Sequence, residues 1–256
     1  MIIGFDATTA SFEKKTGTGV YVEEVIRAME RQYPQDTIVH TYRLVRYLKG
    51  RKFLLPLQGQ SKRQIILDPW TAAKRFDVFH GLNARLPLLR KGVKIVTIHD
   101  LFSLFGRFSE PHFLKDQKKK LELTLARADH IIVPASFTKS LLTEKLGLSE
   151  DKITVVGEGV KSIYLQSRDK NTAKAFIKEQ FQLHDPFFLF IGTLEKRKNI
   201  STIVDSFYRF KAQNSLPHKL VLIGQTGYGF EDISKKIKSD IVRLGFQSEG
   251  VLADFY

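Results

Sequence analysis

Several residue types and patterns are missing from this chain of 256 residues, and each absence excludes a class of protein. The chain has no cysteine, which excludes a disulfide framework, a thiolate metal site and a cysteine nucleophile. No apolar run approaches the ~20 residues that a membrane-spanning helix requires. The amino end, Met1 to Asp6, has the pattern of a short strand and does not resemble a signal peptide. We therefore expect a protein that stays in the cytoplasm.

Acidic residues are also scarce, with 27 Asp and Glu against 41 Lys and Arg, so the formal net charge is +14. A surplus of this size predicts an anionic partner, which can be nucleic acid, an acidic membrane surface or a phosphorylated substrate. A single small phosphorylated ligand does not account for the whole surplus of positive charge. We therefore expect a basic surface with a role besides ligand binding. The hydrophobic fraction of 43% is ordinary for a globular protein with a sizeable core.

The most informative stretch begins after Asp185-Pro186. Five apolar residues, Phe187 to Ile191, predict a strand buried on both faces. Gly192 ends the run, and a segment of helical period starts at Asn199. Arg197 and Lys198 therefore lie in a short loop between the carboxyl end of a strand and a helix, where α/β proteins bind anions. The pattern predicts a phosphate site, and the alternative is two solvated loop cations.

Strands and helices alternate along the rest of the chain, which predicts an α/β fold with parallel sheets. Gly17 and Gly19 precede a helical segment and would let the backbone approach a ligand, although a simple turn explains them as well. A second strand–loop junction ends in His99-Asp100, where an imidazole can contact a sugar hydroxyl or a phosphate; a structural histidine is the alternative. Ser136 is expected to cap a helix that Gly147 ends, and Ile233, Ile237 and Ile241 predict a helix near 231–243.

The interval between Asp36 and Asp68 contains no acidic residue. Basic residues alternate there with aliphatic and aromatic ones, as in segments that lie at a membrane surface. A solvated loop is the alternative, and nucleic acid is a third option for which no recognised binding module is visible. The cations of this interval are Arg43, Arg46, Lys49, Arg51, Lys52, Lys62 and Arg63, and the first five are the membrane-surface candidates.

Three of these motifs together resemble one protein family. Gly-Thr-Leu-Glu-x-Arg-Lys-Asn at 192–199, Gly-Thr-Gly-Val-Tyr at 17–21, and Phe-His-Gly-x-Asn at 79–83 followed by Val-Thr-Ile-His-Asp-Leu at 96–101 are similar to motifs of family 4 glycosyltransferases. The resemblance implies a GT-B-like α/β fold with two doubly wound, Rossmann-like parallel-sheet domains. Residues 1–160 would form the acceptor-side domain, and residues 161–256 the first half of the nucleotide-sugar domain.

The resemblance also implies roles for individual residues. Lys198 would contact the diphosphate of the donor, with Arg197 as the second cation because Thr193 stands where many relatives carry arginine. Gly17 and Gly19 would border the same diphosphate. His99 would be the catalytic residue of the cleft and Asp100 would orient its loop. Gly192, Thr193 and Gly224 would line the cleft between donor and acceptor.

The implied activity is retaining transfer of a hexosyl group, of the mannosyl or rhamnosyl kind, from a nucleoside-diphosphate sugar to a hydroxyl of a glycan or lipid-linked acceptor. No metal and no cofactor besides the donor is expected, and surface polysaccharide or glycolipid synthesis is the implied setting, with peripheral attachment to the inner face of the cell membrane. The family's later Glu-x7-Glu region has no counterpart here, so we expect self-association or a second chain, and little activity from this chain alone. The alternative function is a non-catalytic basic scaffold or regulatory subunit.

Overall fold

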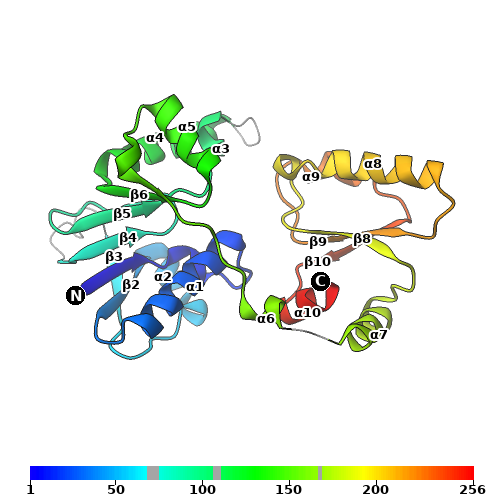
Figure 1. Ribbon diagram of the computed structural model, residues 1–256, viewed down its shortest axis with the longest axis horizontal. Coiled ribbons are helices and arrows are strands. Elements are labelled where there is room, and N and C mark those ends of the chain that lie inside the picture. Colours follow the sequence, from blue (N-terminus) through cyan, green and yellow to red (C-terminus); the bar gives the residue numbers. More distant parts are fainter. Residues whose placement is uncertain (68–74, 106–110, 167–168) are drawn as a thin grey trace. The chain divides into compact units, whose positions relative to one another are not determined.

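The computed structural model describes residues 1–67, 75–105, 111–166 and 169–256 (Figure 1). The chain divides into two compact units, Met1–Glu158 and Gly159–Tyr256, close to the domain boundary expected after residue 160. Each unit is an α/β structure with an entirely parallel sheet. The predicted fold class is therefore confirmed.

The first unit has a seven-stranded sheet in the order β3-β2-β1-β4-β5-β6-β7. The chain runs outward from β1 to β3, returns across β1 and then continues through β4 to β7, which is a doubly wound order. The switch in direction lies between β1 and β4, and ligands bind at such switch points beside the carboxyl ends of the strands. The strands are β1 (Ile2–Asp6), β2 (Thr37–Arg43), β3 (Lys62–Ile66), β4 (Val78–Gly81), β5 (Val93–Thr97), β6 (His130–Val133) and β7 (Ile153–Val155).

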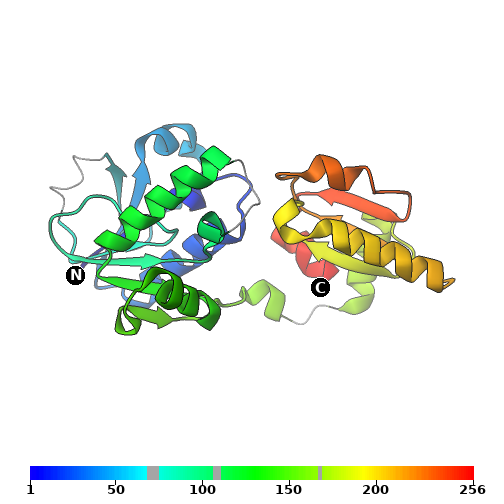
Figure 2. The same ribbon diagram turned by 90° about the horizontal axis from the view of Figure 1, so that it is seen from above.

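Helices cover both faces of this sheet (Figures 1 and 2). One apolar cluster joins Ile3 and Phe5 of β1 to Val22 and Ile26 of α1. The other lies on the opposite face and includes residues of α4 and α5. Successive residues of a strand point to opposite faces, which is why a strand such as β2 contributes to both clusters. The helices of this unit are α1 (Gly17–Gln32), α2 (Leu44–Lys49), α3 (Phe102–Phe105), α4 (Pro111–Arg127) and α5 (Ser136–Leu146), with short 3-10 turns η1 (Thr8–Ser11), η2 (Arg51–Phe53) and η4 (Glu150–Lys152).

The second unit has a three-stranded sheet in the order β10-β9-β8, with α8 and α9 on one face and α7 and α10 on the other (Figure 1). Its central strand β9 is buried along most of its length. The elements are α6 (Ser162–Leu165), α7 (Lys170–Phe181), β8 (Phe187–Ile191), η5 (Lys196–Lys198), α8 (Ile200–Gln213), β9 (Lys219–Ile223), α9 (Phe230–Ser234), β10 (Ile241–Gly245) and α10 (Glu249–Phe255).

Three local predictions are wrong. The strand β8 exists, but it is an edge strand in this sheet and Phe188 is 46% exposed, so it is not buried on both faces. The helix expected near 231–243 ends at Ser234, and Ile241 instead pairs with Leu220 at the start of β10. Ser136 is the first residue of α5 and not its cap, which is Ala135 without a side-chain hydrogen bond. Gly147 does end α5, in the left-handed conformation at φ 66°.

Candidate functional site

In the second unit, the predicted anion loop lies at the carboxyl ends of β8 and β9. Gly192 follows β8 and Gly224 follows β9, both with positive φ. A Cβ on Gly224 would lie 1.9 Å from the carbonyl oxygen of Gly192, so only glycine allows the two strand ends to approach. Thr193 and Leu194 continue from β8, and Leu194 forms an isolated bridge with Thr226. The strand ends are thus held together just before the basic turn.

The basic turn η5 places three consecutive cations before α8. Asn199 ends η5 and caps α8 in the left-handed conformation at φ 53°. The guanidinium of Arg197 donates from Nε and Nη2 to Oε1 of Glu195, at 3.1 and 2.8 Å. Lys196 and Lys198 are exposed, and the described part of the chain offers Lys198 no ion-pair partner. Lys198 is therefore the cation of the predicted site that an incoming anion meets without competition from a carboxylate.

In the first unit, the two predicted glycines belong to the first turn of α1. A Cβ on Gly17 would meet nothing within 4 Å, so its backbone is open to an approaching group. A Cβ on Gly19 would lie 2.8 Å from the carbonyl oxygen of Thr9, so Gly19 has a packing reason of its own. This turn follows β1 and stands at the switch point of the sheet, where a helix amino end favours an anion.

His99 lies just beyond the carboxyl end of β5 and is held on both ring nitrogens. Nδ1 lies 2.9 Å from Oε1 of Glu158, and Nε2 lies 3.0 Å from the carbonyl oxygen of Leu82. A carbonyl and a carboxylate only accept, so both hydrogen bonds form together when the ring carries a proton on each nitrogen. The Glu158 side chain is 49% exposed and the Leu82 partner is backbone, so Glu158 is the partner that a ligand can displace.

A buried polar chain lies behind His99. The Tyr21 ring meets the His99 ring edge-on with centroids 4.7 Å apart, and its hydroxyl lies 3.3 Å from Oγ1 of Thr97. The same Thr97 oxygen lies 2.8 Å from Nε2 of His80. Burial, reinforced by the nearby His99, lowers the pKa of His80 to about 4, so His80 is neutral at pH 7. Burial also raises the pKa of Tyr21, which keeps the phenol protonated.

The structure therefore gathers residues that the sequence motifs did not assign. Glu158 and Tyr21 contact His99 directly, and Thr97 and then His80 extend the chain of contacts behind Tyr21. Asp100 accepts a hydrogen bond from the backbone N–H of Phe102 at 3.3 Å, as a residue that shapes a loop does. Glu158 is 59 positions from His99 in the chain, so only the fold reveals the pair.

The membrane-surface candidates separate into two groups. Arg43 ends β2 and is half-buried, and Arg46 turns inward, donating to the carbonyl oxygen of Ser11 at 3.0 Å with its guanidinium 3.4 Å from the Phe12 ring centroid. Lys49, Arg51 and Lys52 are exposed. Exposed Val45 and Leu48 on α2 lie in the same part of the chain, so the mixture of cations and apolar side chains is present at the surface.

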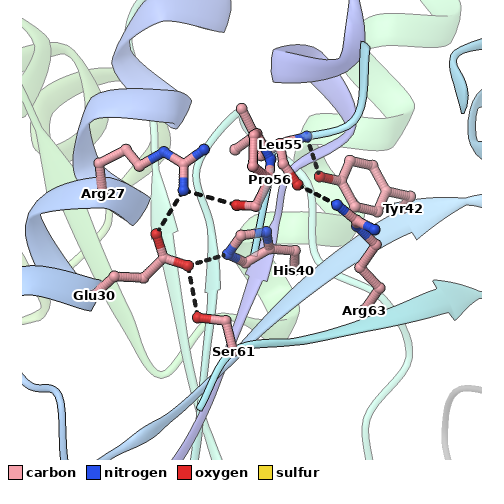
Figure 3. A network of polar contacts seen from close by, with 8 residues as sticks. All are labelled: Arg27, Glu30, His40, Tyr42, Leu55, Pro56, Ser61 and Arg63. Atoms are coloured by element: carbon pink, nitrogen blue, oxygen red, sulfur yellow. Dashed lines mark hydrogen bonds and ion pairs between the residues drawn. The ribbon is translucent and has the colours of Figure 1, made fainter. Parts of the chain in front are cut away.

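A buried network fixes the segment that follows these cations (Figure 3). Glu30 of α1 accepts hydrogen bonds from Arg27 at 3.0 Å, from His40 of β2 at 2.9 Å and from Ser61 at 2.6 Å. Arg27 also donates to the carbonyl oxygen of Pro56 at 2.7 Å. The segment between η2 and β3 is thereby tied to α1 and β2. These contacts could not be predicted from the sequence, because Arg27 and Glu30 resemble ordinary residues of a helix surface.

Neither a metal site nor a membrane span is found in the described ranges. No group of three or more His, Asp or Glu side chains there is arranged to hold a metal ion. None of the described helices has both the length and the apolar character needed to cross a bilayer.

Two units with parallel sheets, each with candidate ligand-binding residues at the carboxyl ends of its strands, make the chain a two-domain α/β protein. The chain belongs to Glycosyltransferase Family 4, whose model matches residues 16–162. It is 24% identical over 153 residues to the O-antigen chain mannosyltransferase B of Escherichia coli, a match that covers 59% of this chain. The matched part spans only 39% of the length of that relative.

Solved glycosyltransferase structures share the fold. HepE from Anabaena, in complex with UDP-glucose, has a TM-score of 0.66 at 12% identity, covering 99% of this chain and 70% of that one. Sucrose-phosphate synthase from Thermosynechococcus elongatus has a TM-score of 0.66 at 13% identity, covering 99% and 72%. WaaG, a glycosyltransferase involved in lipopolysaccharide biosynthesis, has a TM-score of 0.65 at 9% identity, covering 100% and 72%. At these identities the likeness establishes the GT-B fold and nothing about substrates.

Proposed function

We propose that the chain acts in the transfer of a hexosyl group from a nucleoside-diphosphate sugar to an acceptor hydroxyl in the synthesis of a surface polysaccharide or glycolipid. The observation that carries the proposal is membership of Glycosyltransferase Family 4 together with the exposed Lys198 at the end of the β8–α8 connection. The leaving diphosphate gains negative charge as the glycosidic bond breaks, and a fixed cation there stabilises the transition state more than the ground state. Sequence similarity to an O-antigen chain mannosyltransferase supports the transfer of a sugar.

Each unit would contribute a different part of the chemistry. Lys198 neutralises the diphosphate, and Arg197 contributes less because Glu195 already compensates its charge. His99, hydrogen-bonded on both ring nitrogens in the structure, contacts the sugar or the acceptor when Glu158 gives way. Retention of the anomeric configuration and the absence of a metal requirement belong to this proposal. The donor is the substrate, and no separate cofactor takes part.

The experiment is a thermal-shift screen of nucleoside diphosphates and their sugars, followed by a transfer assay with the donor that stabilises the chain most. Proton NMR of the product reports the anomeric configuration. Stabilisation by one nucleotide sugar and a product of retained configuration support the proposal. A chain that binds none of these donors is the outcome expected of a non-catalytic scaffold, and an inverted product would refute retention.

A further inference from the structure

A cavity of about 130 Å3 in the first unit lies between the end of β2, the loop after β4 and α4. Four of the side chains that line it are cationic: Arg43, Arg85, Lys120 and Arg127. In the part of the chain that the structure describes, the other lining residues are Leu86, Leu123 and Thr124, so none of the described carboxylates lines the cavity. Like charges repel, and folding gains nothing from bringing four of them together. The arrangement therefore calls for an anion.

The backbone is bent to place Arg85 in this position. A Cβ on Gly81 would lie 1.9 Å from the carbonyl oxygen of Arg85, so the chain after β4 doubles back closely over a glycine. Ala84 adopts φ 48°, which a side chain other than glycine, asparagine or aspartate rarely does. Leu86, the next residue, is buried in the core cluster of this face. Two unusual backbone positions thus fix Arg85 on a rigid support, which is typical of functional sites.

The charges of the cavity are largely uncompensated. Burial and the neighbouring Arg43 lower the pKa of Arg85, and only the buried Asp6 acts in the opposite direction. The Arg43 side chain has a buried Nε without a hydrogen-bond partner in the part of the chain that the structure describes. Arg127 donates to the carbonyl oxygen of Leu86 at a long 3.4 Å. An arginine stays protonated in a protein, so the cavity keeps its positive charge at neutral pH.

Phosphate is the anion that fits these donors best. Guanidinium forks bind phosphate oxygens in pairs, and a lysine adds a point charge. At ~30 Å3 per water in the liquid, a cavity of about 130 Å3 has the size of a few waters or one small oxyanion. His99 donates to the carbonyl oxygen of Leu82, on the same loop as Arg85, so the cavity and the predicted catalytic residue share one support.

We propose that Arg43, Arg85, Lys120 and Arg127 bind a phosphate group carried by the acceptor. The inference rests on the proposed function, which assigns the donor diphosphate to Lys198 in the other unit and leaves this cluster for a second anion. The acceptor is then a phosphorylated or diphosphorylated compound, and its phosphate anchors it to the domain that carries His99.

The test measures the affinity of the full chain for geranyl diphosphate and for inorganic phosphate by calorimetry. All variants carry Lys198→Ala, which removes the proposed donor site from the measurement. Arg85→Gln and Arg127→Gln each remove one cavity cation. Arg90→Gln is the matched control, because Arg90 is an exposed cation on the same β4–β5 connection and does not line the cavity. Circular dichroism confirms that each variant is folded, which we expect because Arg85→Gln relieves repulsion.

Loss of a charged hydrogen bond predicts a drop in affinity of about tenfold or more for geranyl diphosphate with Arg85→Gln and with Arg127→Gln. Arg90→Gln should stay within about twofold of its Lys198→Ala parent, because long-range charge is screened by salt. Equal losses in Arg85→Gln and Arg90→Gln, or binding of an adventitious ion only, overturn the proposal. Binding to phosphatidylglycerol vesicles is measured in the same variants. If the chain binds these vesicles through Arg85 but does not bind geranyl diphosphate, the cavity holds the phosphate of a membrane lipid, and the proposal of a phosphorylated acceptor is wrong. Binding of the nucleotide-sugar donor is measured separately in chains that keep Lys198. The donor site and the acceptor-phosphate site are thus tested independently, and either proposal can fail without the other.

Discussion

The buried His80 makes the stability of the first unit sensitive to acid, and the size of the effect follows from its pKa. The pKa of His80 in the folded chain is about 4, below the ordinary value of 6.5. Between these two pH values the unfolded chain therefore binds a proton at His80 and the folded chain does not. The contribution of neutral His80 to the free energy of unfolding is fully present above pH 6.5 and is lost as the pH falls towards 4. Linkage then gives a loss of about 2 kcal/mol between pH 7.5 and 5 from this one residue.

The assay is urea denaturation followed by circular dichroism at pH 7.5, 6.5, 5.5 and 5.0, on wild type and His80→Gln. Glutamine keeps a polar group near Thr97 but does not titrate. His80→Gln should therefore lose about 2 kcal/mol less than wild type over this range. The exposed His184, changed to Gln, is the control and should follow wild type. Parallel pH profiles for wild type and His80→Gln would refute the burial argument, whatever their absolute stabilities, because a packing defect shifts both ends of the profile equally.

Three further outcomes are expected. Glu30→Ala should destabilise the chain by about 3–5 kcal/mol in urea, because Arg27, the buried His40 and Ser61 lose their common acceptor. The exposed Glu179→Ala should change stability by less than about 0.5 kcal/mol, and a near-neutral Glu30→Ala would show that the network is dispensable. Vesicles with anionic lipid should bind wild type and release it as the salt concentration rises. Charge reversal to Glu at Lys49, Arg51 and Lys52 should weaken this binding more than the same change at Lys170, Lys174 and Lys178 on α7. Equal effects would mean that only the net charge of the chain matters. Glu195→Gln should strengthen nucleoside-diphosphate binding severalfold by releasing Arg197, and weaker binding would instead make Glu195 a positioning residue for that arginine.

Much of the fold is predictable from local sequence because strands and helices carry different periods. The runs at Ile2–Phe5 and Lys219–Ile223 are strands as expected, and the alternation of strand and helix predicts parallel sheets. The prediction fails where the same spacing of apolar residues fits two different structures. Ile233, Ile237 and Ile241 match a helix, but the chain turns after Ser234 and Ile241 pairs with β9. Likewise, the edge strand β3 was not predicted, because its residues Lys62 and Arg63 resemble those of a basic loop.

The candidate site shows the same division between local and distant information. Motif spacing placed His99 and the basic turn at the carboxyl ends of strands, where the structure has them. It could not pair Glu158 with His99, because the two residues are 59 positions apart in the chain and meet only in the folded unit. Nor did it separate Arg43, which lines a cavity, from Lys49, which faces solvent, because neighbouring cations look alike in a sequence. Distances and burial, more than residue types, assign these roles.

We propose that the turn before α8 holds the diphosphate of a nucleotide donor through Lys198. Calorimetric titration of UDP and GDP into wild type, Lys198→Ala and Lys196→Ala tests this assignment, because Lys196 is also an exposed cation of the same turn. We expect the binding free energy of the nucleotide that binds to weaken by about 1.5–3 kcal/mol in Lys198→Ala and to change by less than about 0.5 kcal/mol in Lys196→Ala. Unchanged affinity in Lys198→Ala, or an equal loss in both variants, would contradict it.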